Sequence, residues 1–197
     1  MKPTKMKKFL TIIVLSLWFM LPSKADDITD FQIEGMGIGD SLLDYFSSNK
    51  IKDADKLFYP SSKTFYQITL VEREYKIYKA VSFSLKNDDK SYKIYNLKGT
   101  IFFSKLNECL KKKDEVVKEI ANISKDLKEE NYTNNFGGKA GKSIAYITDL
   151  KLSGGYARVW CTRWAESVKK EKGWEDSLNV DMSSQEYLNW LNNKAYK

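Results

Sequence analysis

Two cysteines constrain the fold of this chain most strongly, because each lies on the apolar side of a different kind of segment. Cys109 belongs to a stretch from residue 106 to about 129 whose apolar residues recur at helical spacing. Cys161 belongs to a stretch over 155–164 in which apolar and polar residues alternate. An even number of cysteines in a chain that enters an oxidising compartment favours a disulfide. The pattern predicts that Cys109 and Cys161 bond a helix to a strand; two buried free thiols are the alternative.

The first residues are typical of a secretory signal peptide. Four lysines precede an apolar run from Phe9 to Leu21, and the small residues Ser23 and Ala25 suit cleavage after Ala25. The alternative is an uncleaved membrane anchor, but thirteen apolar residues are fewer than the roughly 17–25 that span a bilayer. We therefore expect a signal peptide at 1–25, a single domain at 26–197, and export to the periplasm or the extracellular space.

The charge balance gives no reason to expect a nucleic-acid partner. The chain has 33 basic and 26 acidic side chains, but five lysines and no acid fall within 1–25, which leaves 28 against 26, a net charge of +2. A basic surface for nucleic acid would then depend on clustering of the charges. The run Lys111–Lys113 is followed directly by Asp114 and Glu115, so it indicates a solvated helix face.

Alternation of apolar and polar residues predicts strands, and helical periodicity predicts helices. The expected strands are Phe65–Val71, Ile77–Leu85, Tyr92–Phe103, Ser143–Leu152, Gly155–Trp164 and Leu178–Met182, after a brief strand at Phe31–Ile33. The expected helices run from Asp40 to about Asn49, from Leu106 to about Glu129, and onward from a capping box at Ser183 and Glu186. This order predicts an α+β fold, with a single antiparallel sheet of about five to six strands and three helices packed mainly on one face.

Two glycine-rich stretches resemble phosphate-binding loops but fail the tests of spacing and context. The glycines of IEGMGIGDSLLDYF, Ile33–Phe46, lack the third glycine of a dinucleotide fingerprint, so they predict a turn into a capped helix. The stretch GGKAGKS, Gly137–Ser143, is one residue short of a P-loop and lies at the end of a polar linker expected over 131–142. Gly99, inside an expected strand, indicates a bulge. We expect no nucleotide cofactor.

The chain contains no histidine, which removes the commonest catalytic and metal-binding systems. Ser-His-Asp and Cys-His nucleophiles need histidine as the base, and paired cysteines leave no thiolate for zinc. The acidic pairs Asp88-Asp89, Glu129-Glu130 and Glu175-Asp176 fall in expected turns and element ends, without the spacing of a glycosidase pair. We expect no catalytic residue, no metal site and no cofactor.

An aromatic row on one strand is the strongest candidate for a binding surface. Tyr156, Arg158 and Trp160 point to the face opposite Cys161, and Trp164 continues the row. Such rows suit binding of a sugar or a protein partner, so Tyr156, Arg158, Trp160 and Trp164 are the expected contacts. The alternative is that helices cover this face and make it part of the core.

Four stretches resemble a group of short exported proteins of uncharacterised function from small-genome marine bacteria. They are IEGMGIGDSLLDYF from Ile33, SYKIYNLKG from Ser91, NECLKKKDEVVKEI from Asn107 and WLNNKAYK from Trp190. The resemblance extends over most of residues 26–197 and implies export, but no activity and no site residues. The glycine turn also resembles the helix entry of small outer-membrane assembly lipoproteins and of β-lactamase-inhibitor-like domains. The lipid-bearing cysteine of those lipoproteins has no counterpart in this sequence.

Together these features predict a non-enzymatic binding or interaction module of the cell envelope. Its partner would be an envelope protein or a glycan, with no nucleic acid and no transmembrane segment after cleavage. A binder of a saccharide or another small ligand through the aromatic row is the second hypothesis. A carboxylate-based hydrolase is the third, because active sites normally gather titratable groups and none is evident.

Overall fold

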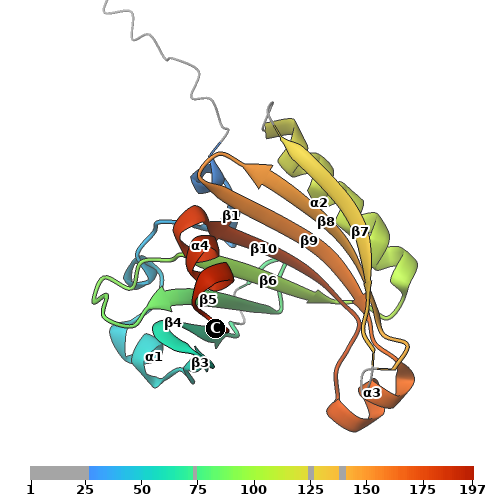
Figure 1. The fold of residues 1–197 in the computed structure, drawn as a ribbon, viewed down its shortest axis with the longest axis horizontal. Helices are drawn as coiled ribbons and strands as arrows, with labels where there is room; N and C mark the ends of the chain where they lie inside the picture. The colour runs from blue at the N-terminus through green and yellow to red at the C-terminus, as the bar shows by residue number, and fades with distance from the viewer. Residues whose placement is uncertain (1–26, 73–74, 124–126, 138–140) are drawn as a thin grey trace, which may run out of the picture.

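The computed structural model describes residues 27–72, 75–123, 127–137 and 141–197, so the signal peptide expected at 1–25 lies outside the described residues. Its main feature is one antiparallel sheet with the strand order β3-β4-β5-β6-β10-β9-β8-β7 (Figure 1). The strands are β3 (Leu57–Tyr59), β4 (Ser62–Leu70), β5 (Ala80–Lys86), β6 (Asn96–Phe102), β7 (Lys128–Asn135), β8 (Ile144–Leu152), β9 (Gly155–Arg163) and β10 (Ser177–Ser184).

The expected sheet of five to six strands is therefore wrong, since the described chain forms a mostly β structure with an 8-stranded sheet and a separate 2-stranded sheet. The two unpredicted strands of the large sheet, β3 and β7, are its edges. Seven of the eight residues of the edge strand β7 are exposed to solvent. No face of this strand is buried in the core, so its sequence KEENYTNN shows no alternation of apolar and polar residues. The prediction of helix to about residue 129 and polar linker over 131–142 failed for this reason, because α2 (Leu106–Ile123) ends earlier and β7 follows it.

The strand that comes last in the sequence, β10, lies in the middle of the sheet. Strands β3 to β6 pair in sequence order, as do β7 to β9, and β10 pairs with both β6 and β9. It thereby joins two meanders into one sheet. The sequence predicted only a short strand here, but a strand with neighbours on both sides buries most of its residues, and six of the eight in β10 are buried.

One face of the sheet carries the main hydrophobic core, and α2 lies across it. Alternate residues of β9, among them Val159 and Cys161, belong to this core together with Cys109 of α2. The disulfide Cys109–Cys161 is present with its Cα atoms 6.0 Å apart, so the predicted pairing is confirmed and the two cysteines are not free thiols. It fastens the helix to the centre of the sheet.

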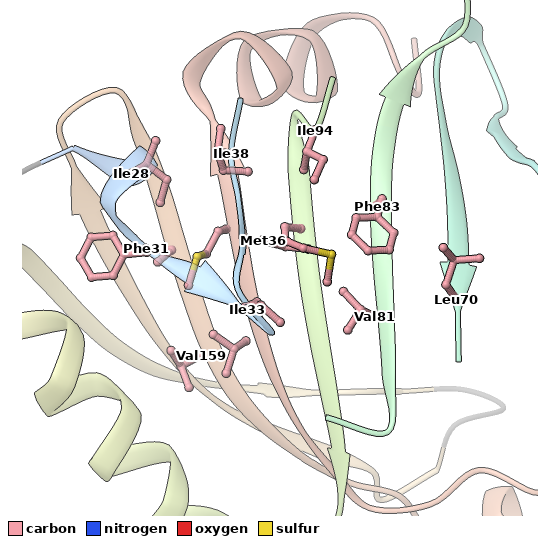
Figure 2. Packing of buried hydrophobic residues seen from close by; sticks show 14 of the residues in the cluster. Ile28, Phe31, Ile33, Met36, Ile38, Leu70, Val81, Phe83, Ile94 and Val159 are labelled. Atoms are coloured by element: carbon pink, nitrogen blue, oxygen red, sulfur yellow. The ribbon is translucent and has the colours of Figure 1, made fainter. Parts of the chain in front are cut away.

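A small hairpin of β1 (Gln32–Ile33) and β2 (Met36–Gly37) covers the same face beside α2. Figure 2 shows its Ile33 and Met36 packed among core residues of the large sheet. The turn of the hairpin places Glu34 and Gly35 at φ values of 53° and 80°, a conformation that suits two-residue hairpin turns. The glycines of this stretch thus serve a hairpin and its exit.

The helix expected from Asp40 to about Asn49 does not form. Ser41 caps a single 3-10 turn at Leu42–Asp44, and a separate helix α1 begins later, at Ser48–Asp53. In that stretch Leu42 is buried and Phe46 packs against the core, whereas Leu43 and Tyr45 are exposed, so a continuous helix would have little apolar surface to bury.

The opposite face of the sheet carries a second, aromatic cluster under α4 (Gln185–Asn193). The buried members of this cluster are Phe65, Tyr95, Tyr187, Trp190 and Ala195. Helices α2 and α4 therefore lie on opposite faces (Figure 1), which corrects the expectation of three helices mainly on one face. The fourth helix, α3 (Glu166–Lys172), lies in the connection between β9 and β10. The cap of α4 is Ser184 and not the predicted Ser183.

Gly99 does not mark a bulge, because its strand pairs in continuous register with both neighbours. A side chain at this position would place its Cβ 2.4 Å from the ring of Tyr78. The glycine is required for close packing of that ring on β6.

Candidate functional site

A pocket of about 690 Å³ opens on the sheet face beside α4. Its floor comes from polar residues of β6, β8, β9 and β10 together with Ala145 and Ile147 of β8, and α4 forms one wall through Gln185, Tyr187 and Leu191. The pocket exists because the alternate residues of these strands that face away from the core are mostly polar, and α4 covers only part of that face.

A row of charged side chains crosses the floor of the sheet at this pocket. Successive strands place Lys98, Asp181, Arg158, Asp149 and Glu130 as direct cross-strand partners, in the strand order β6, β10, β9, β8 and β7. Partners at this separation interact strongly, and their charges alternate over the first four positions. Of this row, Arg158 and Asp181 line the pocket.

Arg158 is held by its neighbour Asp149 and by two phenol groups. Its Nε donates to Oδ1 of Asp149 at 2.7 Å, and its Nη2 donates to Oδ2 of Asp149 and to the hydroxyl oxygens of Tyr132 and Tyr156, each at 2.9 Å. Burial alone would raise the pKa of Asp149, but the hydrogen bonds from Arg158, Tyr156 and Tyr132 and the charge of Arg158 together outweigh it and lower that pKa. The guanidinium is consequently fixed in position and its charge is neutralised by one carboxylate.

Asp181 is bound differently, by neutral groups. Its Oδ1 accepts hydrogen bonds from Nδ2 of Asn96 at 2.6 Å and from Oγ of Ser183 at 3.0 Å, while Oδ1 of Asn96 accepts from Oγ of Ser84 at 3.2 Å. Within the described residues no lysine or arginine nitrogen lies within 4.0 Å of this carboxylate. Burial raises the pKa of Asp181, and the hydrogen bonds and the more distant Lys98 and Arg158 offset only part of that rise.

The structure brings together three of the four aromatic-row residues predicted as contacts. Tyr156, Arg158 and Trp160 are partly buried and line the pocket. Trp164 lies elsewhere, stacked on Phe136 with ring centroids 5.4 Å apart and against Trp174 at 4.6 Å. The row is thus neither a fully exposed platform nor core, and its role in binding stays a prediction.

Sequence reasoning missed Asp181 and Asn96 as pocket residues. A signal was available for Asp181, because Asn179 and Asp181 alternate with apolar residues in the strand expected at Leu178–Met182. The sequence did not reveal the order of the strands in the sheet, and Asp181 lies beside Arg158 only because β10 pairs between β6 and β9.

Other expected features bear on the site as follows. Part of the P-loop-like stretch Gly137–Ser143 lies outside the described residues. Among the residues that the structure describes, no group of three or more histidine, cysteine, aspartate or glutamate side chains could hold a metal ion. In the same part of the chain, every helix is too short or too polar to cross a membrane.

No protein-family model, curated protein or solved structure matches this chain. The resemblance to short exported proteins accordingly stays an expectation, and function has to be argued from the geometry of the pocket.

Proposed function

We propose that this chain is a non-enzymatic binding module of the cell envelope and that the pocket beside α4 is its ligand site. The observation that carries the proposal is the pocket itself: about 690 Å³ of space over a floor of fixed polar groups. Ligand sites typically have volumes of about 300–1,000 Å³ and a few well-placed polar groups. The disulfide Cys109–Cys161 is consistent with export of such a module.

A saccharide or a similar small polar molecule suits this pocket better than a protein surface does. Trp160 and Tyr156 supply aromatic rings, and Asn96, Gln185 and Asp181 supply both hydrogen-bond donors and acceptors. A sugar ring has apolar faces that stack on aromatic rings and hydroxyl groups that both donate and accept. A protein partner, the other candidate from the sequence, needs a broad contact surface, whereas this site is a pocket of about 690 Å³.

The hydrolase hypothesis is weakened by the state of the carboxylates. A glycosidase needs two carboxyl groups that face each other across the scissile bond. Both oxygens of Asp149 are occupied by Arg158, so Asp181 is the one lining carboxylate that is free to meet a ligand among the described residues. A single available carboxyl group supports binding more than hydrolysis.

A glycan array screened with the exported chain, followed by calorimetry on any hit, tests the proposal. We expect Trp160→Ala to abolish binding and Trp174→Ala, in a tryptophan outside the pocket, to leave it unchanged. Circular dichroism of both variants checks that they are folded. Equal loss of binding in both variants, or a ligand that binds wild type and Trp160→Ala alike, would place the site elsewhere.

A further inference from the structure

We infer that the ligand of this pocket carries a protonated amine and that Asp181 is the residue that binds it. The inference rests on the proposed function, since it assigns a chemical class to the ligand of the same site. Its basis is a difference between the two charged residues of the row that line the pocket: Arg158 is already paired with Asp149, whereas Asp181 has no ion pair among the described residues.

The charge of Arg158 is compensated because its guanidinium forms an ion pair with Asp149. Nε and Nη2 of the guanidinium donate to the two oxygens of one carboxylate at 2.7 and 2.9 Å, and the hydroxyl oxygens of Tyr132 and Tyr156 accept from the same Nη2. A bidentate pair of this kind is among the strongest side-chain contacts. Arg158 is therefore a poor counter-ion for a second acid or for an anionic ligand.

Asp181 keeps a free oxygen. Asn96 and Ser183 both donate to Oδ1, and no residue in the described part of the chain donates a hydrogen bond to Oδ2. Lys98 is the cross-strand partner on the far side, but its ammonium lies beyond 4.0 Å and it does not line the pocket. Lys151 lines the pocket from an exposed position on β8, in the neighbouring row. The half-buried carboxylate of Asp181 thus lacks a direct counter-charge.

Aromatic rings complete the site. Tyr156, Trp160 and Tyr187 line the pocket together with Asp181. Ring faces attract ammonium groups, and a carboxylate beside such rings is a frequent way to bind a cation. An amine would gain a charge-assisted hydrogen bond to Asp181 and contacts with the rings, whereas a neutral hydroxyl would gain only a weaker bond.

The test compares two trisaccharides that differ in charge: a trimer of glucosamine and its fully N-acetylated counterpart, by calorimetry at about pH 6, where the free amines are protonated. We expect the amine form to bind about tenfold more tightly, a difference typical of one charge-assisted contact. Asp181→Asn keeps the acceptor for Asn96 and Ser183, so it should remove the preference and retain binding of the neutral sugar. Lys98→Met is the matched control and should keep or increase the preference.

The outcomes separate this inference from the proposed function. Equal affinity for both sugars, or a preference that survives in Asp181→Asn, overturns the amine assignment and leaves a neutral saccharide site. If neither sugar binds, the saccharide proposal fails, and 1,5-diaminopentane is tested alone. Diamine binding that is lost in Asp181→Asn supports the amine site without a sugar, and no binding of the diamine overturns it.

Discussion

Arg158 and Asp181 are direct cross-strand partners on β9 and β10, yet Arg158 forms its ion pair with Asp149 on β8. Opposite charges in such positions commonly pair. Here Tyr132 and Tyr156 contribute two further acceptors on the Asp149 side, which favours that direction for the guanidinium. Because Arg158 pairs with Asp149, Asp181 has only neutral hydrogen-bond partners, and its carboxylate stays available to a ligand in the pocket.

Asp149→Asn should destabilise the fold by about 1–3 kcal/mol near neutral pH, because it replaces the charged acceptor of Arg158. The pKa of Asp149 is lowered in the folded chain, so its contribution is fully present above the unfolded pKa of about 3.9 and is lost as the pH falls through the folded value. Urea denaturation from pH 7 to about pH 3 should show the difference in stability between the two proteins shrink as the pH falls below about 3.9. Glu130→Gln, at the exposed end of the same row, is the control with little effect. A difference that is constant over this range would contradict the role of the charge.

Loss of the disulfide should reduce the free energy of unfolding by about 4 kcal/mol on the chain-entropy model, because Cys109 and Cys161 are 52 positions apart. The variant Cys109→Ser/Cys161→Ser tests this in urea. A reductant should lower the unfolding midpoint of wild type toward that of the variant and leave the variant unchanged. Midpoints that coincide without reductant would mean that α2 is held by packing alone.

Glu34 should act as a clamp between the small hairpin and the segment before β5. Its two oxygens accept backbone N–H bonds from Lys76, Ile77 and Tyr78 at 2.7 to 2.9 Å. Burial acts to raise its pKa, but these three bonds lower it overall, so the stabilisation is present above the unfolded pKa and disappears as the pH falls through the folded one. We expect Glu34→Gln to cost about 1–2 kcal/mol at pH 7 and less in acid, measured by thermal unfolding.

The exposed Glu175→Gln is the control for that substitution, and its stability should match wild type at every pH. Equal losses in Glu34→Gln and Glu175→Gln would show that the hairpin is held without this carboxylate.

The inner parts of the fold could be predicted because burial on one face imposes a period on the sequence. The strands around Val159 and Phe83 and the helix that carries Cys109 follow from that rule, and so does the disulfide. The edge strand β7 could not be predicted, because it faces solvent and its residues carry no such period.

The site was predictable only in part, for a related reason. Alternation in β9 places Tyr156, Arg158 and Trp160 on one face, but it does not say what covers that face. The pocket depends on where α4 docks and on the central position of β10, both of which are set by contacts between residues far apart in the chain. Trp164 does not lie with the other three residues of the row, because its ring packs against Phe136 and Trp174, which come from other segments of the chain.

The contact between Gly99 and Tyr78 gives a prediction about packing alone. A Cβ at residue 99 would lie 2.4 to 2.8 Å from three carbons of the Tyr78 ring, and Gly99 sits in regular register between Val81 and Val180. Since the strand cannot shift without breaking both ladders, the ring must move, and we expect Gly99→Ala to cost about 1–3 kcal/mol in urea denaturation.

A double-mutant cycle separates this clash from a general intolerance of side chains at residue 99. In a Tyr78→Ala background the ring is gone, so Gly99→Ala should become nearly neutral, with a coupling energy of about 1–3 kcal/mol between the two positions. Gly137→Ala is the matched control, because a Cβ there meets nothing within 4 Å and the change should stay within about 0.5 kcal/mol. Additive losses in the double variant would mean that strand conformation, and not the ring of Tyr78, requires the glycine.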